Sequence, residues 1–231
     1  MKPFYKWFGA ALLTICSPPR LAQADRLGLD PARGSEIGAV YQAWLSPQQE
    51  GGEERDTPKW IPNKFRSSTA SVDREKRTAR GHGLLRFSKD YSRAYVDLKI
   101  EGLDPATITM FHIHCGKPGV LGPILVDFGL KQNLKVAFSA GVFSAEVLNE
   151  DLVVVWHNSH HSVVGFATLG CPIGQLNPGD LLKPFDRVKT IAGMAGIARE
   201  GELYFNVHTT GQQYFGAMRG QLEAVNDLQA R

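Results

Sequence analysis

The chain has 231 residues, of which 43% are hydrophobic and 21% charged, values typical of a soluble globular protein with one well-buried domain. Its net charge of +3 lies entirely in residues 1–24, which hold three basic residues and no acidic one. The remainder is neutral, which gives no electrostatic reason to expect nucleic acid as a partner.

The first 24 residues have the pattern of a secretory signal peptide. Lys2 and Lys6 precede a short apolar run over 7–16, and Ala-Gln-Ala at 22–24 provides a small-residue cleavage site. A membrane anchor is the alternative, but the run is shorter than the roughly 20 apolar residues that span a bilayer. We therefore expect cleavage and export, to the periplasm or outside the cell, with no membrane span elsewhere.

Export changes the interpretation of the three cysteines. Cys16 leaves with the signal peptide, so that Cys115 and Cys171 remain. Two cysteines in an oxidising compartment most simply form one disulfide. A Cys115 thiolate that binds metal is the alternative, but in an extended strand its side chain shares the face of Phe111 and Ile113, away from the neighbouring histidines. We therefore favour the disulfide.

Short β-strands are the elements expected along most of the chain. A flexible lead-in at 25–35 precedes them, and a polar tail at 226–231 follows. The strands are predicted at 37–45, 83–87, 94–100, 110–116, 123–128, 203–209 and 217–225, with one further strand or hairpin within 134–148. Turn signals at regular intervals between short strands indicate an all-β sandwich or barrel.

Two longer segments interrupt the strands. Residues 46–66 are predicted to form a polar loop, and 67–80 a loop or an edge strand, with Glu53 and Glu54 as solvated charges. Residues 149–200 are predicted to form a long crossover connection that contains a short helix at 188–198. Their apolar content is too low for the core of a second domain.

Histidines occupy one face of two predicted strands that are far apart in the sequence. His112 and His114 alternate with apolar residues in 110–116, and His208 does so in 203–209. If both apolar faces join one core and the strands are neighbours, the three imidazoles converge. Imidazole nitrogen suits copper and zinc, and three ligands plus solvent suit copper or catalytic zinc. The alternative is that the rings bond to loop backbone and brace the fold.

Other residues are candidates for supporting roles. A fourth ligand is sought among His82, at the start of a strand, and the crossover histidines His157, His160 and His161. Histidine clusters in polar loops are most often solvated, and metal scavenging is the alternative for these. Asn206 and Arg219 alternate with core residues on their strands and are expected beside the metal ligands. Arg219 there either guides anions or forms a salt bridge.

Three separated blocks of the sequence resemble the CHRD domain, named after chordin. They are an opening at 45–50, the Phe-His-Ile-His block at 107–124 and the Phe-Asn-Val-His block at 204–222, within a domain that spans 36–225. The resemblance implies an extracellular or periplasmic protein with a Greek-key sandwich or barrel, immunoglobulin-like or similar to copper/zinc superoxide dismutase. The Phe-His-Ile-His strand is similar to the copper-binding strand of that enzyme. Its zinc ligands are not matched, since 119–127 offers only Asp127, which argues against dismutase activity.

The sequence therefore predicts an exported, mainly β protein that binds a transition metal, copper before zinc, through His112, His114 and His208. No catalytic residue is predicted. The first alternative is a metal-free module that binds another extracellular or periplasmic protein. The second is a redox enzyme of the dismutase type.

Overall fold

A computed structural model describes residues 34–159, 169–172 and 187–225, together with Leu27, Leu29 and Gly165. The predicted signal peptide, most of the predicted lead-in, His160, His161 and the tail lie outside these described residues.

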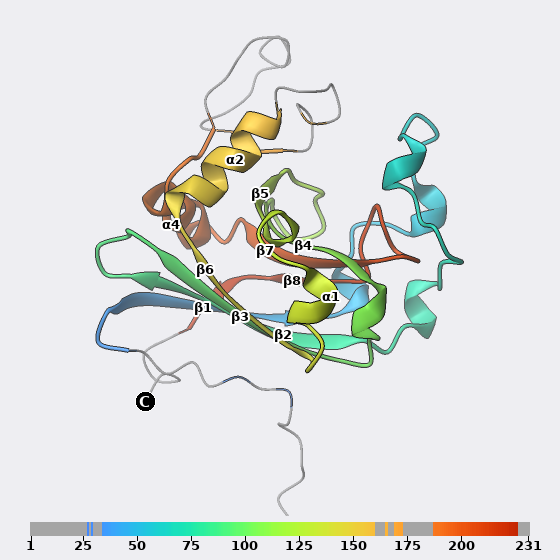
Figure 1. The fold of residues 1–231 in the computed structure, drawn as a ribbon, viewed down its shortest axis with the longest axis horizontal. Helices are drawn as coiled ribbons and strands as arrows, with labels where there is room; N and C mark the ends of the chain where they lie inside the picture. Colours follow the sequence, from blue (N-terminus) through green and yellow to red (C-terminus); the bar gives the residue numbers. More distant parts are fainter. Residues whose placement is uncertain are drawn as a thin grey trace, which may run out of the picture.

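The described strands form two antiparallel sheets that pack as a sandwich (Figure 1). The five-stranded sheet has the order β6 (Val142–Val147), β3 (Ala94–Glu101), β2 (Arg80–Ser88), β1 (Ile37–Leu45) and β9 (Glu223–Ala224). The four-stranded sheet has the order β5 (Ile124–Asp127), β4 (Ile108–Cys115), β7 (Leu203–Thr209) and β8 (Met218–Gln221). The predicted mainly β sandwich is therefore confirmed, and in the part of the chain that is described the sheets do not close into a barrel.

The hydrophobic core lies between the two sheets. Phe111 of β4 and Phe205 of β7 are fully buried in it, and the Phe111 ring lies 5.0 Å, edge to face, from that of Phe143 in the opposite sheet. Burying an aromatic side chain of this size contributes about 1.5–3 kcal/mol. Because successive side chains of a strand point to opposite faces, the burial of Phe111 and Phe205 determines which face of β4 and β7 turns away from the core.

Short helices occupy the connections between strands. The 3-10 helices are η1 (Pro47–Gln49), η2 (Glu54–Asp56), η3 (Asn63–Phe65), η4 (Arg74–Lys76), η5 (Pro105–Thr107) and η6 (Phe128–Leu130). The α-helices of the described residues are α1 (Leu134–Ala137), α2 (Asn149–Ser159) and α4 (Ile191–Arg199).

The helices and strands agree with the sequence in part. The helix predicted at 188–198 is confirmed as α4, which begins after Thr190, whose side chain accepts a hydrogen bond from the Gly193 N–H. Of the strand or hairpin predicted within 134–148, the strand is confirmed as β6, and the hairpin is wrong because Asn133 caps the helix α1 in its first half. The strand predicted at 217–225 is divided, since β8 and β9 belong to different sheets.

A disulfide joins Cys115, at the end of β4, to Cys171, with 6.0 Å between their Cα atoms. This bond was the favoured interpretation of the two cysteines and is confirmed. It ties the strand that carries two of the candidate histidines to the crossover segment. Among the described residues, no helix has both the length and the apolar character to cross a membrane.

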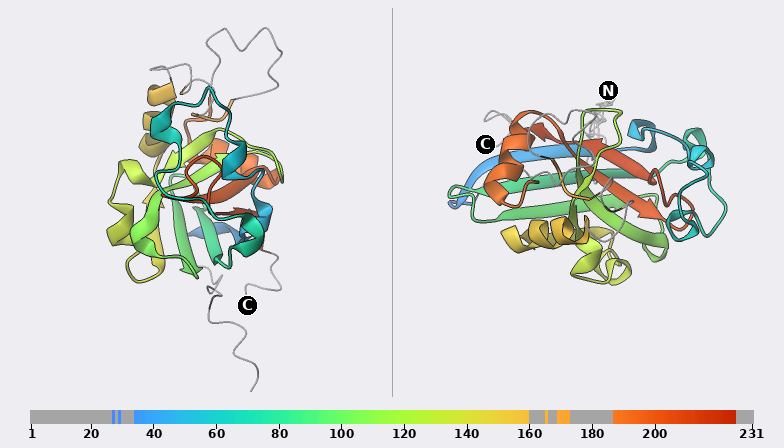
Figure 2. Two further views of the ribbon diagram at one scale, coloured as in Figure 1. Left: turned by 90° about the vertical axis from the view of Figure 1, so that its right-hand side faces the viewer. Right: turned by 90° about the horizontal axis from the view of Figure 1, so that it is seen from above.

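The polar segment at 46–79 is fastened to the connection between β7 and β8, at one end of the sandwich (Figure 2, cyan and teal). The expectation that Glu53 and Glu54 are solvated is wrong. Glu53 pairs with Arg74 at 2.9 Å, and Glu54 accepts hydrogen bonds from the backbone N–H groups of Tyr214 and Phe215 at 3.1 and 3.2 Å. Glu53 therefore neutralises a cation, and Glu54 satisfies two backbone N–H groups of the connection between β7 and β8.

Candidate metal centre

Neighbouring strands bring the three candidate histidines together. β4 and β7 pair directly, with Met110 opposite His208 and His112 opposite Asn206. The imidazoles lie on the face that turns away from the core, as the alternation predicts. The His112 ring centroid lies 5.2 Å from that of His114 and 5.1 Å from that of His208.

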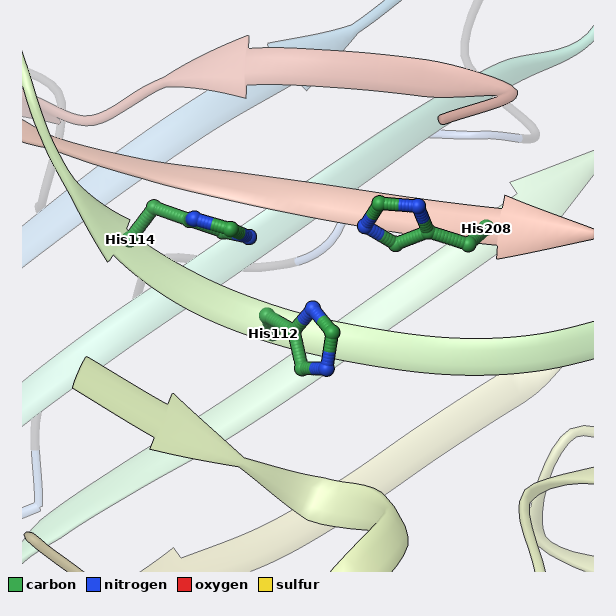
Figure 3. Close-up of side chains that lie close together, drawn as sticks. All are labelled: His112, His114 and His208. Atoms are coloured by element: carbon green, nitrogen blue, oxygen red, sulfur yellow. The ribbon is translucent and has the colours of Figure 1, made fainter. Parts of the chain in front are cut away.

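The ring nitrogens converge on one point. One nitrogen of each ring lies within 4.8 Å of the corresponding nitrogens of the other two. Figure 3 shows these nitrogens turned toward a shared space between the strands. His112, His114 and His208 are buried, with exposed fractions of 1%, 8% and 4%. An ion held there would be almost completely removed from solvent.

Loop carbonyls fix the orientation of two of the rings. Nδ1 of His114 donates to the carbonyl oxygen of Gly122 at 2.8 Å, and Nδ1 of His208 donates to that of Gln213 at 2.9 Å. Since a carbonyl only accepts, each neutral ring carries its hydrogen on Nδ1 and keeps a lone pair on Nε2. Both Nε2 atoms are buried without a hydrogen-bond partner. A hydrogen bond of this kind behind a ring is the usual support of a metal-binding histidine.

The carboxylate of Asp127 lies behind the third ring at ion-pair distance, although Nε2 of His112 makes no hydrogen bond. Its Oδ1 lies 3.5 Å from Nε2 of His112, and the two residues are opposite each other on β5 and β4. Burial alone would raise the pKa of the Asp127 carboxyl, but the contact with His112 outweighs it and the pKa is lowered. With Nε2 turned toward the carboxylate, Nδ1 of His112 is left for the shared space, and it is buried without a partner.

Burial keeps two of the rings neutral. Burial, and then the charge of a protonated His112, lower the pKa of His208 to about 3. The same two causes hold the pKa of His114 well below its usual value. Because a metal binds the deprotonated ring, protons do not compete with a metal at these two nitrogens near neutral pH.

Arg219 reaches the cluster through Tyr204. The Tyr204 ring stacks on the His114 ring, and the Arg219 guanidinium lies over its other face. Arg219 is only 1% exposed and donates to the carbonyl oxygens of Lys117 and Val120. Its side chain faces outward from the sheet, as expected. It bonds to loop carbonyls and not to a carboxylate, so the expected salt bridge is not formed. Because it is buried, it is not open to anions from solvent.

The remaining histidines do not join the cluster. His82 lies on β2 of the other sheet, between Gly81 and Gly83, which both pack against core side chains, so that its ring is on the far side of the sandwich. Its Nδ1 accepts from the Leu29 N–H at 2.7 Å, and its ring stacks on Trp44. His157 is exposed on α2, against the ring of Trp156. His160 and His161 lie outside the described residues.

Several supporting groups were not found from the sequence. They are the carboxylate of Asp127 as the partner of His112, the ring of Tyr204, and the carbonyls of Gly122 and Gln213. Asp127 could have been found by pairing the predicted strand at 123–128 antiparallel to β4. The carbonyls carry no side-chain signal at all, since any residue provides one.

Comparison with known proteins supports one family. A family model described as the CHRD domain matches residues 65–222, which hold all three clustered histidines. No curated protein and no solved structure matches the chain.

Proposed function

Because the chain belongs to the CHRD domain family, we propose that it is an exported member that binds one transition-metal ion, copper before zinc, through His112, His114 and His208. Export is supported by the family and by the Cys115–Cys171 disulfide, since such bonds persist in oxidising compartments. The amino-terminal pattern of a signal peptide favours the same conclusion.

Three partnerless ring nitrogens carry the proposal. Nε2 of His114, Nε2 of His208 and Nδ1 of His112 are buried without a hydrogen-bond partner. An unsatisfied buried polar group costs about 1–3 kcal/mol. Three such groups turned toward one point would destabilise a metal-free fold, whereas a single bound cation would satisfy all three.

The donor set favours copper over a structural zinc site. All three donors are imidazole nitrogens, which suit both metals. A closed, structural zinc site takes a fourth protein ligand, whereas three imidazoles with an open position suit copper or a catalytic zinc ion. Among the described residues no fourth histidine, cysteine or carboxylate joins the cluster. Asp127 faces the back of His112 and is placed to orient that ring rather than to bind the ion.

Metal titration of the stripped, folded protein tests the proposal. Binding of Cu(I), Cu(II) and Zn(II) is measured against chelators of known affinity, for the wild type, for the double variant His112→Ala/His114→Ala and for His208→Ala. We expect one ion per chain, affinity tighter than micromolar for copper, and a loss of at least about 100-fold in either variant. Nitrogen coupling in the electron paramagnetic resonance spectrum of the Cu(II) form reports imidazole ligation.

His157→Ala is the matched control, since His157 is an exposed histidine of the same chain. It should bind copper as the wild type does. Equal binding by the double variant and the wild type contradicts the proposal.

A metal-free interaction module is the second candidate, and one observation favours it. The Nδ1 bonds of His114 and His208 to loop carbonyls would brace the 116–122 loop and the connection after β7 without any ion. Failure of the wild type to bind either metal more tightly than micromolar, together with a loss of stability in both histidine variants, supports this candidate in place of the first.

A further inference from the structure

A buried carboxyl group without an ion-pair partner lies beside the histidine face. Glu50 follows η1 in the 46–79 segment, and its side chain reaches Asn206 of β7. Glu50 is 3% exposed and Asn206 is 1% exposed. Asn206 in turn pairs with His112 across the sheet.

The two side chains face each other with one hydrogen bond made and two oxygens left over. Nδ2 of Asn206 donates to Oε2 of Glu50 at 3.4 Å. Oε1 of Glu50 and Oδ1 of Asn206 are both buried without a partner. Both oxygens pack against the same face of Gly216, since a Cβ on that residue would be 2.8 Å from Oε1 and 2.1 Å from Oδ1. Two oxygens that only accept do not satisfy each other.

No cation of the described residues pairs with this carboxyl group. The charges of Arg74, Arg77 and Arg219 favour its charged form, but none of them forms an ion pair with it, and Nε of Arg77 is itself buried without a partner. Arg74 and Arg77 bind Glu53, and Arg219 binds loop carbonyls. Burial is the larger effect, and it raises the pKa of Glu50 to about 8.

We propose that Glu50 is a neutral carboxylic acid in the folded protein and forms a two-hydrogen-bond pair with the Asn206 carboxamide. Nδ2–H of Asn206 donates to Oε2, and the acid proton on Oε1 is donated to Oδ1. The proton satisfies both leftover oxygens at once. The pair fastens the 46–79 segment to β7 directly beside His112, so that Glu50 is a positioning residue. The proposal does not depend on whether a metal binds.

The pair gives the segment a dependence on pH. Glu50 takes up its proton on folding wherever the unfolded chain has lost it, which is between its unfolded pKa of 4.5 and its folded pKa of about 8. The folding equilibrium constant therefore falls by up to about tenfold per pH unit across this window as pH rises, and levels off above it. Titration of the histidines is common to the wild type and a Glu50 variant, and it cancels when the two are compared.

Glu50→Gln tests the pair, because a glutamine keeps the shape and offers an N–H in place of the acid O–H. Urea unfolding of both proteins is measured from pH 5 to pH 9. We expect the folding constant of the wild type to fall relative to that of Glu50→Gln up to pH 8, and the variant to be the more stable protein above it. A ratio that is constant or rises with pH overturns the proposal.

Glu54→Gln is the control in the same segment. Glu54 accepts from the N–H groups of Tyr214 and Phe215, so its replacement should weaken the fold by a similar factor at every pH from 5 to 9. The ratio of hydrogen-exchange rates over 46–79, wild type to Glu50→Gln at the same pH, should rise as pH passes 8, because base catalysis of exchange is common to both proteins. Equal exchange at pH 9 contradicts the positioning role.

A direct readout remains if Glu50→Gln does not fold. The infrared carbonyl band of a protonated carboxylic acid should be present in the wild type at pH 6.5 and lost by pH 9.5. Its absence at pH 6.5 overturns the proposal.

Discussion

The Tyr204 ring lies parallel to the His114 imidazole, with 4.8 Å between ring centroids and 8° between ring planes. The Arg219 guanidinium lies 3.4 Å from the centroid on its other face, so that the phenol is held between a cation and a candidate metal ligand. The hydroxyl of Tyr204 accepts from the Gly122 N–H at 3.0 Å, in the loop whose carbonyl orients His114. One side chain therefore positions both the ring and the loop.

Tyr204→Ala should be among the more damaging single changes. It removes a fully buried aromatic ring and leaves a cavity, which costs about 3–5 kcal/mol. Tyr204→Phe keeps the stack and loses only the bond to Gly122, for about 1 kcal/mol. Urea unfolding of both variants measures the difference. Equal losses would mean that the hydroxyl, and not the ring, carries the contribution of Tyr204.

Asp127→Asn should weaken metal binding while leaving all three proposed ligands in place. The carboxylate lies behind Nε2 of His112, and loss of such a supporting group typically lowers metal affinity by about 10–100-fold. Chelator competition with Cu(I) measures the change. Asp97→Asn is the matched control, because Asp97 pairs with Arg86 in the other sheet. An unchanged affinity in Asp127→Asn would show that Asp127 does not position His112.

His208 should make the metal-free protein sensitive to acid. Its pKa is about 3 in the folded state and 6.5 in the unfolded state, so the unfolded chain binds the extra proton between these values. Stability is therefore complete above pH 6.5 and falls as pH decreases toward 3, by up to about 1.4 kcal/mol per pH unit. Denaturant midpoints from pH 7 to pH 4 measure this slope.

His208→Gln, which does not titrate, serves as the reference for the acid series. The wild type should lose stability faster than this variant as the solution is acidified. Parallel pH profiles for the two proteins would contradict the prediction.

The Cys115–Cys171 disulfide should leave no free thiol in the folded, oxidised protein without residues 1–24. Its removal in Cys115→Ala/Cys171→Ala should cost about 2–5 kcal/mol of stability. Thiol titration in denaturant and urea unfolding test the two statements separately. Detection of two free thiols would show that the bridge does not form in the exported chain.

Much of the site was predictable, because strand alternation has a fixed period of two. Residues 110–116 and 203–209 reveal which side chains face the core, so the convergence of the three histidines required only that these strands be neighbours. The same rule correctly turned Arg219 outward from the sheet. These predictions rest on local pattern alone.

The parts that failed depend on contacts between distant segments. Glu53 and Glu54 read as solvated in a polar loop, and only the fold brings Arg74 and the Tyr214 N–H to them. His82 has the local pattern of an outward histidine, but its strand belongs to the other sheet. The helix α1 begins at a cap by the Asn133 side chain. The apolar residues after Asn133 have the pattern of a strand, so this cap was not recognised in the sequence.

His112 and His114 are near neighbours in the chain, whereas His208 arrives from a strand made much later. If the three rings bind an ion as proposed, the third ligand reaches the other two only when β7 pairs with β4. The complete site would then exist only in the folded sheet. Such an ion would favour the folded state over the unfolded one by an amount that grows with ion concentration through mass action.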